Sequence, residues 1–467
     1  MKSAVYTKAG QVGLAEIDRP QIVAADDAII KIVRTCVCGS DLWSYRNPEM
    51  EEGHRNSGHE AIGIVEEVGE QVTTVKPGDF VIAPFTHGCG QCDACRAGFD
   101  GSCDNHSGNN WSEGVQAEYI RFHFANWALV KILGQPSDYS EGMLKSLLTL
   151  ADVMPTGYHA ARVANVQKGD KVVVIGDGAV GQCAVIASKM RGASQIVLMS
   201  RHEDRQKMAL ESGATAVVAE RGEKGIDKVR EILGGGADAA LECVGTEAAV
   251  EQALGVLHNG GRMGFVGVPH YNNRSLGSTF AQNILVAGGV ASVTTYDKQV
   301  LLKAVLDGDI NPGRVFTTSY KLEDINQAYK DMDERKSIKS MIVLETLSII
   351  AYRQPVTKLE IEKIRGVKSD HAVNRLVEYN LVYEAGRLDA PGRPALFATT
   401  EEFMRRFGIG TLSDLPNMDP EQEDEIRTAV EEELKFKLEE LGSSNATEEA
   451  QELLEAAVTK EQEQEKE

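Results

Sequence analysis

The sequence contains no stretch approaching the ~20 consecutive apolar residues that a membrane-spanning helix needs. Its first residues, MKSAVYTKAGQVG, lack the long apolar core of a secretory signal peptide. The 45 glycines follow no G-x-y period, which excludes a collagen-like chain. We therefore expect a protein that stays in the cytoplasm and has no membrane partner.

Basic residues are also scarce, because 49 Lys and Arg stand against 70 Asp and Glu, for a net charge of −21. The excess is concentrated in 417–467, which holds 18 acidic and 5 basic residues. Proteins that bind nucleic acid favour basic surfaces, so we expect no direct nucleic-acid partner. Hydrophobic residues at 42% and charged residues at 25% are typical of a globular chain. At 467 residues, it has room for about three domains.

The pattern of apolar residues changes along the chain and predicts its domains. Up to about residue 150, short alternating runs broken by Gly, Pro and Asp indicate a β-rich domain. From Lys171, strands alternate with helices, which predicts an α/β fold with a doubly wound parallel sheet. After 344, two short helices (the first capped by Thr357, the second by Ser369) and a strand pair indicate a winged helix. The predicted domains are a β-rich domain at 1–152 and 290–344, a doubly wound α/β domain at 153–289, a winged-helix domain at 345–416 and an acidic helical or disordered tail at 417–467.

Four cysteines lie within fifteen residues, in the pattern C-x2-C-x2-C-x7-C. Such spacing in a chain without a secretion signal indicates metal binding before disulfides or unrelated thiols. Four thiolates complete a tetrahedral zinc and leave no open position for a substrate. The sequence therefore predicts a closed, structural zinc bound by Cys89, Cys92, Cys95 and Cys103.

A second set of metal-binding residue types is spread over the first 152 positions, with C-G-S-D at 38–41 and G-H-E at 58–60. A catalytic zinc takes three protein ligands and keeps one position open. Cys38 and His59 can supply two of these ligands, and Asp152 can supply the third. A lone cysteine or histidine is more often a structural residue than a metal ligand. Asp41 is placed to orient a ligating imidazole, and Ser40 to relay a proton to water.

The motif G-D-G-A-V-G at 176–181 follows the strand KVVVI and opens a helix. In that context it is a dinucleotide-binding fingerprint rather than a plain glycine-rich turn. Gly176 permits the tight turn, Gly178 lets the pyrophosphate approach, and Gly181 allows close helix packing. The helix N-terminus at Ala179 and Val180 attracts the phosphates.

The next strand ends in LMSRHEDR, where an enzyme that uses NAD places an acidic residue to bind the ribose diol. Here Ser200 and Arg201 occupy that position, with Arg205 as a second candidate contact. A carboxylate repels a 2′-phosphate, whereas a hydroxyl and a guanidinium bind it. The sequence therefore favours NADP(H) over NAD(H), with a solvated Arg201 as the alternative.

Together, these motifs closely resemble the zinc-containing medium-chain alcohol dehydrogenases, in order and spacing, from about 1 to 344. The resemblance implies a GroES-like catalytic domain, a Rossmann domain, and the reversible oxidation of an alcohol to an aldehyde or ketone. It also implies a homo-dimer or homo-tetramer. By position, Cys38, His59 and Asp152 correspond to the catalytic zinc ligands, Glu60 to a neighbour that can reach the metal, and Ser40 to the proton relay.

The sequence departs from that family at Trp43, where many members have a relay histidine. Proton release is then expected directly to solvent or through His54, or else the indole narrows the substrate pocket. By analogy, Trp111 and Met154 are candidate pocket walls.

Residues 344–416 resemble a different family, segregation and condensation protein B. The segments LETLSIIAYRQPVTKLEIEKIRGVKSD and GRLDAPGRPALFATTEEFMRRFG match its second winged-helix domain, and its first domain is missing. The resemblance implies a protein-binding module with a kleisin-type partner. With 10 basic and 9 acidic residues, 345–410 is not suited to strong binding of DNA. Two hypotheses follow. In the first, the chain is a dehydrogenase that carries a passenger module, and the two parts are joined either functionally or by an accident of gene fusion. In the second, it is an interaction protein of chromosome segregation whose dehydrogenase region is incidental.

Overall fold

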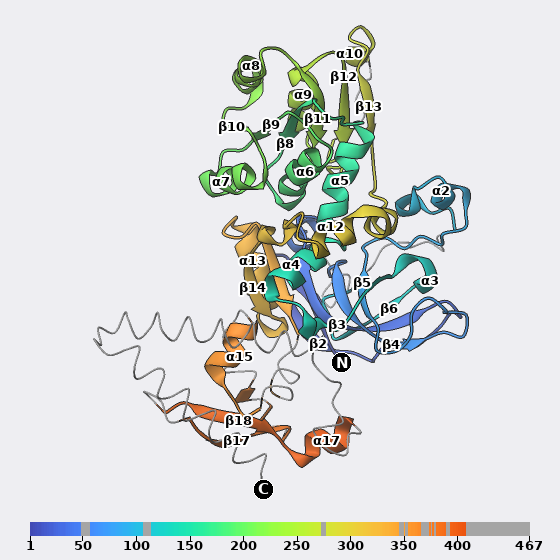
Figure 1. The fold of residues 1–467 in the computed structure, drawn as a ribbon, viewed down its shortest axis with the longest axis vertical. Helices are drawn as coiled ribbons and strands as arrows, with labels where there is room; N and C mark the ends of the chain where they lie inside the picture. The colour runs from blue at the N-terminus through green and yellow to red at the C-terminus, as the bar shows by residue number, and fades with distance from the viewer. Residues whose placement is uncertain are drawn as a thin grey trace. The chain divides into compact units, whose positions relative to one another are not determined.

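The computed structural model describes most of the chain up to residue 407 (Figure 1). None of its described helices is both long and apolar enough to cross a lipid bilayer. The residues it describes are 1–47, 57–105, 114–271, 277–344, 350, 354–365, 373–374, 376–377, 380–388 and 393–407.

A seven-stranded sheet built from both ends of the dehydrogenase-like region forms one half of that region. Strand β15 (Lys339–Val343) pairs antiparallel with β3 (Ala28–Val37), with Met341 opposite Cys36, so the chain returns to this sheet after the second domain. The remaining strands of this sheet are β14 (Phe316–Lys321), β4 (Ala61–Val68), β5 (Phe80–Ala83), β7 (Val130–Ile132) and β6 (Tyr119–Phe122). A separate two-stranded sheet consists of β1 (Lys2–Lys8) and β2 (Gln11–Glu16).

The second half contains a six-stranded parallel sheet, and its strand order reverses direction at the strand that comes first in the chain. Its strands lie in the order β10 (Ala216–Val218), β9 (Gln195–Met199), β8 (Lys171–Ile175), β11 (Ala237–Glu242), β12 (Leu257–Phe265) and β13 (Leu285–Gly288). Ligands bind such sheets where the strand order reverses, here between the carboxyl ends of β8 and β11. The predicted doubly wound α/β fold is confirmed.

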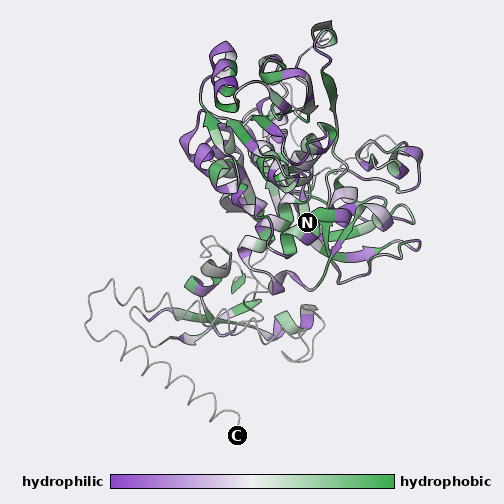
Figure 2. Ribbon diagram, turned by 45° about the horizontal axis from the view of Figure 1, so that its top comes forward, coloured by the Kyte–Doolittle hydropathy of each residue, from purple (hydrophilic) through white to green (hydrophobic). Residues whose placement is uncertain are grey.

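Burial on both faces of the central strands β9, β8 and β11 explains their nearly continuous apolar sequences, and hydrophobic residues are green in Figure 2. Val172 and Val174 belong to the core on one face, and Val173 and Ile175 to the core on the other. The covering helices are α5 (Val153–Val163), α6 (Ala179–Met190), α7 (Glu203–Ser212), α8 (Gly222–Leu233) and α9 (Glu247–Val256).

Shorter helices complete the dehydrogenase-like region. They include α1 (Asp41–Arg46), α2 (Asp93–Arg96), α3 (Ala125–Ala128), α4 (Glu141–Thr149), α10 (Gly277–Phe280), α11 (Val293–Tyr296), a π-helical turn (Asp297–Leu301), α12 (Leu302–Leu306) and α13 (Ile325–Asp333).

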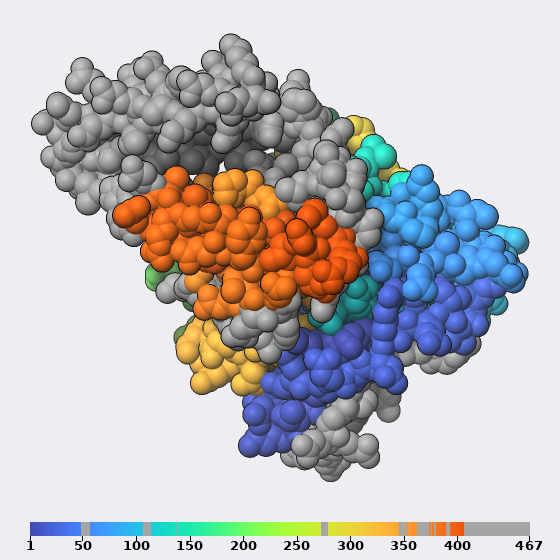
Figure 3. Space-filling model, turned by 90° about the horizontal axis from the view of Figure 1, so that it is seen from below, coloured from blue at the N-terminus to red at the C-terminus, as the bar shows by residue number. Residues whose placement is uncertain are grey.

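The winged-helix prediction is also confirmed. Thr357 caps the first helix as predicted, because its Oγ1 accepts from the Glu360 backbone N at 3.2 Å while the Glu360 carboxylate accepts from the Thr357 N at 2.6 Å. Ser369 lies outside the described residues. The elements are β16 (Val356–Thr357), α15 (Lys358–Arg365), β17 (Val382–Arg387), β18 (Ala395–Thr399) and α17 (Glu401–Phe407), and β17, β18 and α17 form the orange-to-red surface in Figure 3.

A buried histidine on α5 makes the stability of the dehydrogenase-like region sensitive to acid. His159 Nδ1 lies 2.5 Å from the Tyr296 hydroxyl, which also accepts from Arg162 at 3.0 Å. Burial, followed by the charge of Arg162, lowers the pKa of His159 to about 4. Between pH ~6.5 and ~4 the unfolded chain therefore binds a proton that the folded chain does not, and stability falls as the pH falls.

We expect His159→Gln to reduce the loss of unfolding free energy between about pH 7 and about pH 4.5 by about 2–3 kcal/mol. Urea unfolding at both pH values measures this difference. His258→Gln is the control, because the Asn259 carbonyl and Asp238 raise the pKa of that exposed imidazole. An acid loss as large in His159→Gln as in the parent chain would contradict the assignment.

Candidate functional site

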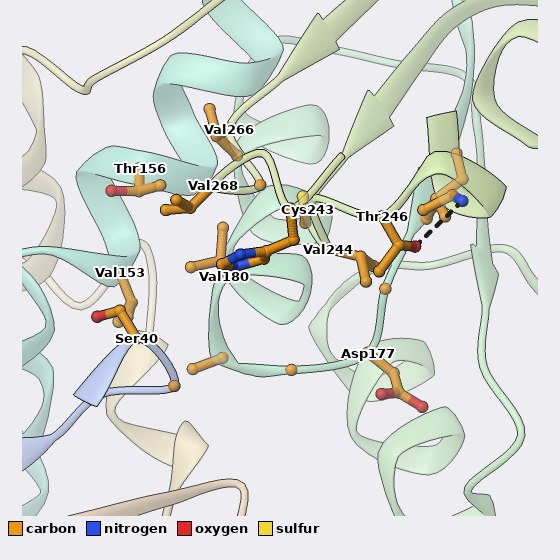
Figure 4. Close-up of a pocket in the computed structure, with 18 of the residues that line it drawn as sticks. Ser40, Val153, Thr156, Asp177, Val180, Cys243, Val244, Thr246, Val266 and Val268 are labelled. Carbon is orange, nitrogen blue, oxygen red and sulfur yellow. Dashed lines mark hydrogen bonds between the residues drawn. The ribbon is translucent and has the colours of Figure 1, made fainter. Parts of the chain in front are cut away.

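A cavity of about 1260 Å³ is lined by residues of both halves of the dehydrogenase-like region. Cys38, His59 and Asp152 line it together with residues 176–180 of the glycine-rich turn. Figure 4 shows Ser40, Val153 and Thr156 at one side of this cavity and Asp177 at the other. The two predicted sites therefore open into one space.

Strand pairing brings the first predicted metal ligands together. Strand β3 ends one residue before Cys38, and β4 begins two residues after His59. Because the two strands are antiparallel and pair Thr35 with Ala61, the end of one lies beside the start of the other. Asp152 joins them as the N-cap residue of α5. One possible ligand atom each from Cys38, His59, Glu60 and Asp152 all lie within 4.8 Å of one another.

Asp41 fixes the orientation of two members of this cluster. Its Oδ2 accepts from the Cys38 backbone N at 2.8 Å, and its Oδ1 lies 3.3 Å from His59 Nδ1. The other imidazole nitrogen, Nε2, then faces Asp152 Oδ2 at 3.4 Å, and that oxygen lies 3.6 Å from Cys38 Sγ. The geometry is that of a metal-binding imidazole held from behind by a carboxylate.

Glu60 adds a fourth candidate ligand that a buried lysine restrains. Glu60 Oε1 lies 2.6 Å from Lys339 Nζ and 3.8 Å from His59 Nε2, and both charged side chains are 1% exposed. Within the described part of the chain, Glu60 Oε2 is buried without a hydrogen-bond partner. One thiol, one imidazole and two carboxylates around an unsatisfied oxygen fit a zinc ion. Sequence reasoning missed Lys339, which lies 279 residues from Glu60.

The charges in this cluster support one another. Burial alone raises the pKa of the Asp152 carboxyl, but the hydrogen bond and charge of His59 and the charge of Lys339 outweigh it and lower that pKa. Burial alone lowers the pKa of His59, but Asp41, Cys38 and Asp152 raise it well above its ordinary value. The carboxylate of Asp152 is therefore kept ionised and available to a cation.

The four cysteines of the segment 89–103 also converge. The Sγ atoms of Cys89 and Cys95 lie 4.0 Å apart, and those of Cys92 and Cys103 lie 3.8 Å apart. A tetrahedron with Zn–S distances of about 2.3 Å has edges of about 3.8 Å, so the set fits zinc. Burial raises the pKa of Cys89, but N–H donors from Gln91, Cys92 and the Asn105 side chain lower it to about 6, which favours the thiolate.

The glycine-rich turn has the geometry that its sequence predicts. Gly176 has φ +110°, which favours glycine, and a Cβ on Gly181 would lie 1.9 Å from the Gly176 carbonyl oxygen. A Cβ on Gly178 would meet no described atom within 4 Å, so space is open there. Ala179 and Val180 begin α6 and line the cavity, so the turn and helix N-terminus fit a pyrophosphate.

Ser200, Arg201 and Arg205 line the same cavity beyond the turn. A carboxylate that sequence reasoning did not consider already contacts two of them. Ser200 Oγ donates to Asp177 Oδ2 at 2.6 Å, and Arg205 Nη1 donates to Asp177 Oδ1 at 3.1 Å. A further cation, Arg335, comes from the half that contains the seven-stranded sheet; it also lines the cavity and was missed.

The structure corrects one of the two pocket walls that were predicted by analogy with the dehydrogenase family. Met154 is fully buried and does not line the cavity, because it faces the core, whereas its neighbour Val153 lines it along with Phe85. Trp111 and His54 lie outside the described residues. Trp43 does line the cavity, and its ring lies 3.7 Å from the His270 ring, centre to centre, at 31°.

Three family models match the chain. They are the alcohol dehydrogenase GroES-like domain at 24–133, the zinc-binding dehydrogenase domain at 179–303, and the segregation and condensation complex subunit ScpB at 309–418. The last range overlaps β14 and β15, which belong to the seven-stranded sheet.

Individual relatives divide the chain in the same way. A zinc-type alcohol dehydrogenase-like protein of Bacillus subtilis, AdhB, is 31% identical over 74% of this chain and 100% of its own length. The structure of alcohol dehydrogenase TADH from Thermus sp. ATN1 is 29% identical, with a TM-score of 0.66, and covers 74% of this chain and all of that one. Segregation and condensation protein B of Agathobacter rectalis is 62% identical over 104 residues, 22% of this chain and 56% of that protein.

The chain thus spans about half of the segregation protein that it matches, but the whole length of the dehydrogenase. With the fold, the zinc-compatible clusters and the dinucleotide turn, this coverage shows that the chain belongs to the zinc-type alcohol dehydrogenase family and carries a C-terminal ScpB domain.

Proposed function

We propose that the chain is a zinc-dependent dehydrogenase that transfers a hydride reversibly between a small alcohol and NADP(H). The observation that carries this proposal is the convergence of Cys38, His59 and Asp152 at the wall of the cavity that also holds the glycine-rich turn. When bound, zinc supplies polarisation of an alcohol oxygen, and the nicotinamide supplies the hydride acceptor.

The chain's own residues position these groups and move the proton. Cys38, His59 and Asp152 bind the catalytic zinc, and Asp41 holds the imidazole and the Cys38 backbone. Ser40, the exposed N-cap of α1 at the cavity wall, accepts the alcohol proton and passes it to solvent. Glu60 is held by Lys339 beside the ligands, and a second zinc bound by the four cysteines stabilises the segment 89–103.

The choice of NADP(H) rests on the residues after β9. Ser200, Arg201 and Arg205 line the cavity and offer a hydroxyl and two guanidinium groups to a 2′-phosphate. Arg205 is the better placed of the two arginines, because its side chain is only 11% exposed. Gly176, Gly178, Ala179 and Val180 line the cavity and bind the pyrophosphate, and Gly181 allows α6 to pack closely against the turn.

A turnover assay tests this proposal directly. The purified chain is assayed with primary and secondary alcohols, with NADP and NAD in parallel, and with and without a zinc chelator. We expect reduction of NADP that the chelator abolishes and that exceeds reduction of NAD. Preferred use of NAD would reject the cofactor assignment, and no turnover by chain holding two zinc ions would reject the enzymatic assignment for these substrates.

For the C-terminal domain we propose a kleisin-type protein partner, supported by the 62% identity over 104 residues to a segregation protein. We also propose that the chain forms a homo-oligomer and acts in the cytoplasm. All eight cysteines are free, and a reducing compartment keeps such thiols available to zinc.

Pull-down of a purified kleisin by the full chain, lost on deletion of 345–467, would support the partner assignment. Equal retention without that segment would reject it.

A further inference from the structure

The glycine-rich turn carries a carboxylate whose contacts bear on the choice of cofactor. Asp177 is the second residue of the turn, and its side chain is 17% exposed. Both of its oxygens accept from residues that follow β9: Oδ2 from Ser200 Oγ at 2.6 Å, and Oδ1 from Arg205 Nη1 at 3.1 Å. All three residues line the cavity, and Asp177 lies at the side away from Ser40 in Figure 4.

Ser200 and Arg205 are two of the three groups assigned to a 2′-phosphate, yet the Asp177 carboxylate already accepts hydrogen bonds from both. The Ser200 hydroxyl has one proton to donate, and Asp177 receives it. A phosphate must therefore take these donors from Asp177, and it must lie beside an ionised carboxylate that repels it. Each of these requirements lowers the affinity for a phosphorylated ribose.

A ribose without the phosphate meets the opposite situation. A carboxylate has about four acceptor positions, and Ser200 and Arg205 use two at Asp177. Its remaining positions can accept from a ribose hydroxyl, which is the task of the acidic residue that is missing at Ser200. The carboxylate is absent after β9, but the fold supplies one from the turn after β8.

We propose that Asp177 limits the preference for NADP(H), by competing with the 2′-phosphate for Ser200 and Arg205 and by accepting from the unphosphorylated ribose. This inference rests on the proposed function only in the use of a nicotinamide dinucleotide. It predicts that removing the carboxylate moves the preference toward NADP(H), whatever the preference of the parent chain.

The test measures dissociation constants, so it does not depend on finding the alcohol. NADH and NADPH are titrated separately into the zinc-loaded full chain and followed by nucleotide fluorescence. For Asp177→Asn we expect NADPH to bind about tenfold more tightly and NADH a few-fold more weakly. Asp204→Asn is the matched control. It removes the same charge from an exposed position on α7, next to Arg205, and should leave both constants within about twofold.

A second pair of variants tests whether Asp177 affects phosphate binding through Arg205. If Asp177 competes with the phosphate for Arg205, Asp177→Asn should improve NADPH binding by less than about threefold in an Arg205→Met background. A ratio of the two dissociation constants that is unchanged in Asp177→Asn would overturn the proposal, as would a full shift that persists without Arg205. Binding of both nucleotides without alcohol turnover would reject the proposed function alone, and binding of neither would reject both.

Discussion

Replacement of Cys38 by alanine is expected to lower dehydrogenase turnover by at least about a thousandfold and to lower the zinc content from two ions per chain to one. Cys38 Sγ lies 3.6 Å from Asp152 Oδ2 in the cluster that we assign to the catalytic zinc. A metal that polarises a reacting oxygen contributes several kcal/mol to transition-state stabilisation, and about 4 kcal/mol corresponds to three powers of ten. Steady-state kinetics and metal analysis on the same sample measure both effects.

Cys36→Ala is the matched control for this prediction. Cys36 lies on the same strand, β3, two residues earlier, and is 1% exposed. Burial raises the pKa of its thiol well above the ordinary value, so it remains neutral. We expect this variant to keep both zinc ions and most of its turnover. Turnover of Cys38→Ala within about tenfold of the parent, with two zinc ions still bound, would show that Cys38 is not a ligand.

The parts of the site that the sequence predicts are those whose chemistry depends on short spacing. The four cysteines of the segment 89–103 are close in sequence, and Sγ atoms lie 4.0 Å apart in Cys89 and Cys95 and 3.8 Å apart in Cys92 and Cys103. The glycines of the turn are equally local, since Gly181 must lack a Cβ because of the Gly176 carbonyl five residues away. The overall fold could also be predicted, because strands that alternate with helices along the chain allow few arrangements of a parallel sheet.

The parts that could not be predicted depend on contacts between distant segments. Lys339 belongs to the last strand of the dehydrogenase-like region, and only the pairing of β15 with β3 places it near Glu60. Asp177 was visible in the motif, but its contact with Arg205 depends on how α7 packs beside the turn. Met154 and Val153 are neighbours on α5, and helix orientation alone decides that Val153 faces the cavity.

Replacement of Lys339 by methionine is expected to lower the free energy of unfolding by about 3–5 kcal/mol. Lys339 Nζ lies 2.6 Å from Glu60 Oε1 and 3.4 Å from the Val37 carbonyl oxygen, and the side chains of the ion pair are 1% exposed. Methionine keeps most of the buried volume but leaves the Glu60 carboxylate without its positive partner in a low-dielectric environment. Chemical unfolding of the zinc-loaded chain measures the loss.

Two further variants separate the effect of burial from that of the ion pair. Lys336 makes a contact of the same 2.6 Å length with Glu334, but both side chains are exposed, at 63% and 40%, so Lys336→Met should leave stability essentially unchanged. Glu60→Gln combined with Lys339→Met removes both charges and should recover most of the lost stability, because an unpaired buried charge is the main cost. If Lys339→Met were as stable as Lys336→Met, Lys339 would not neutralise Glu60, and Glu60 would then be free to approach the metal.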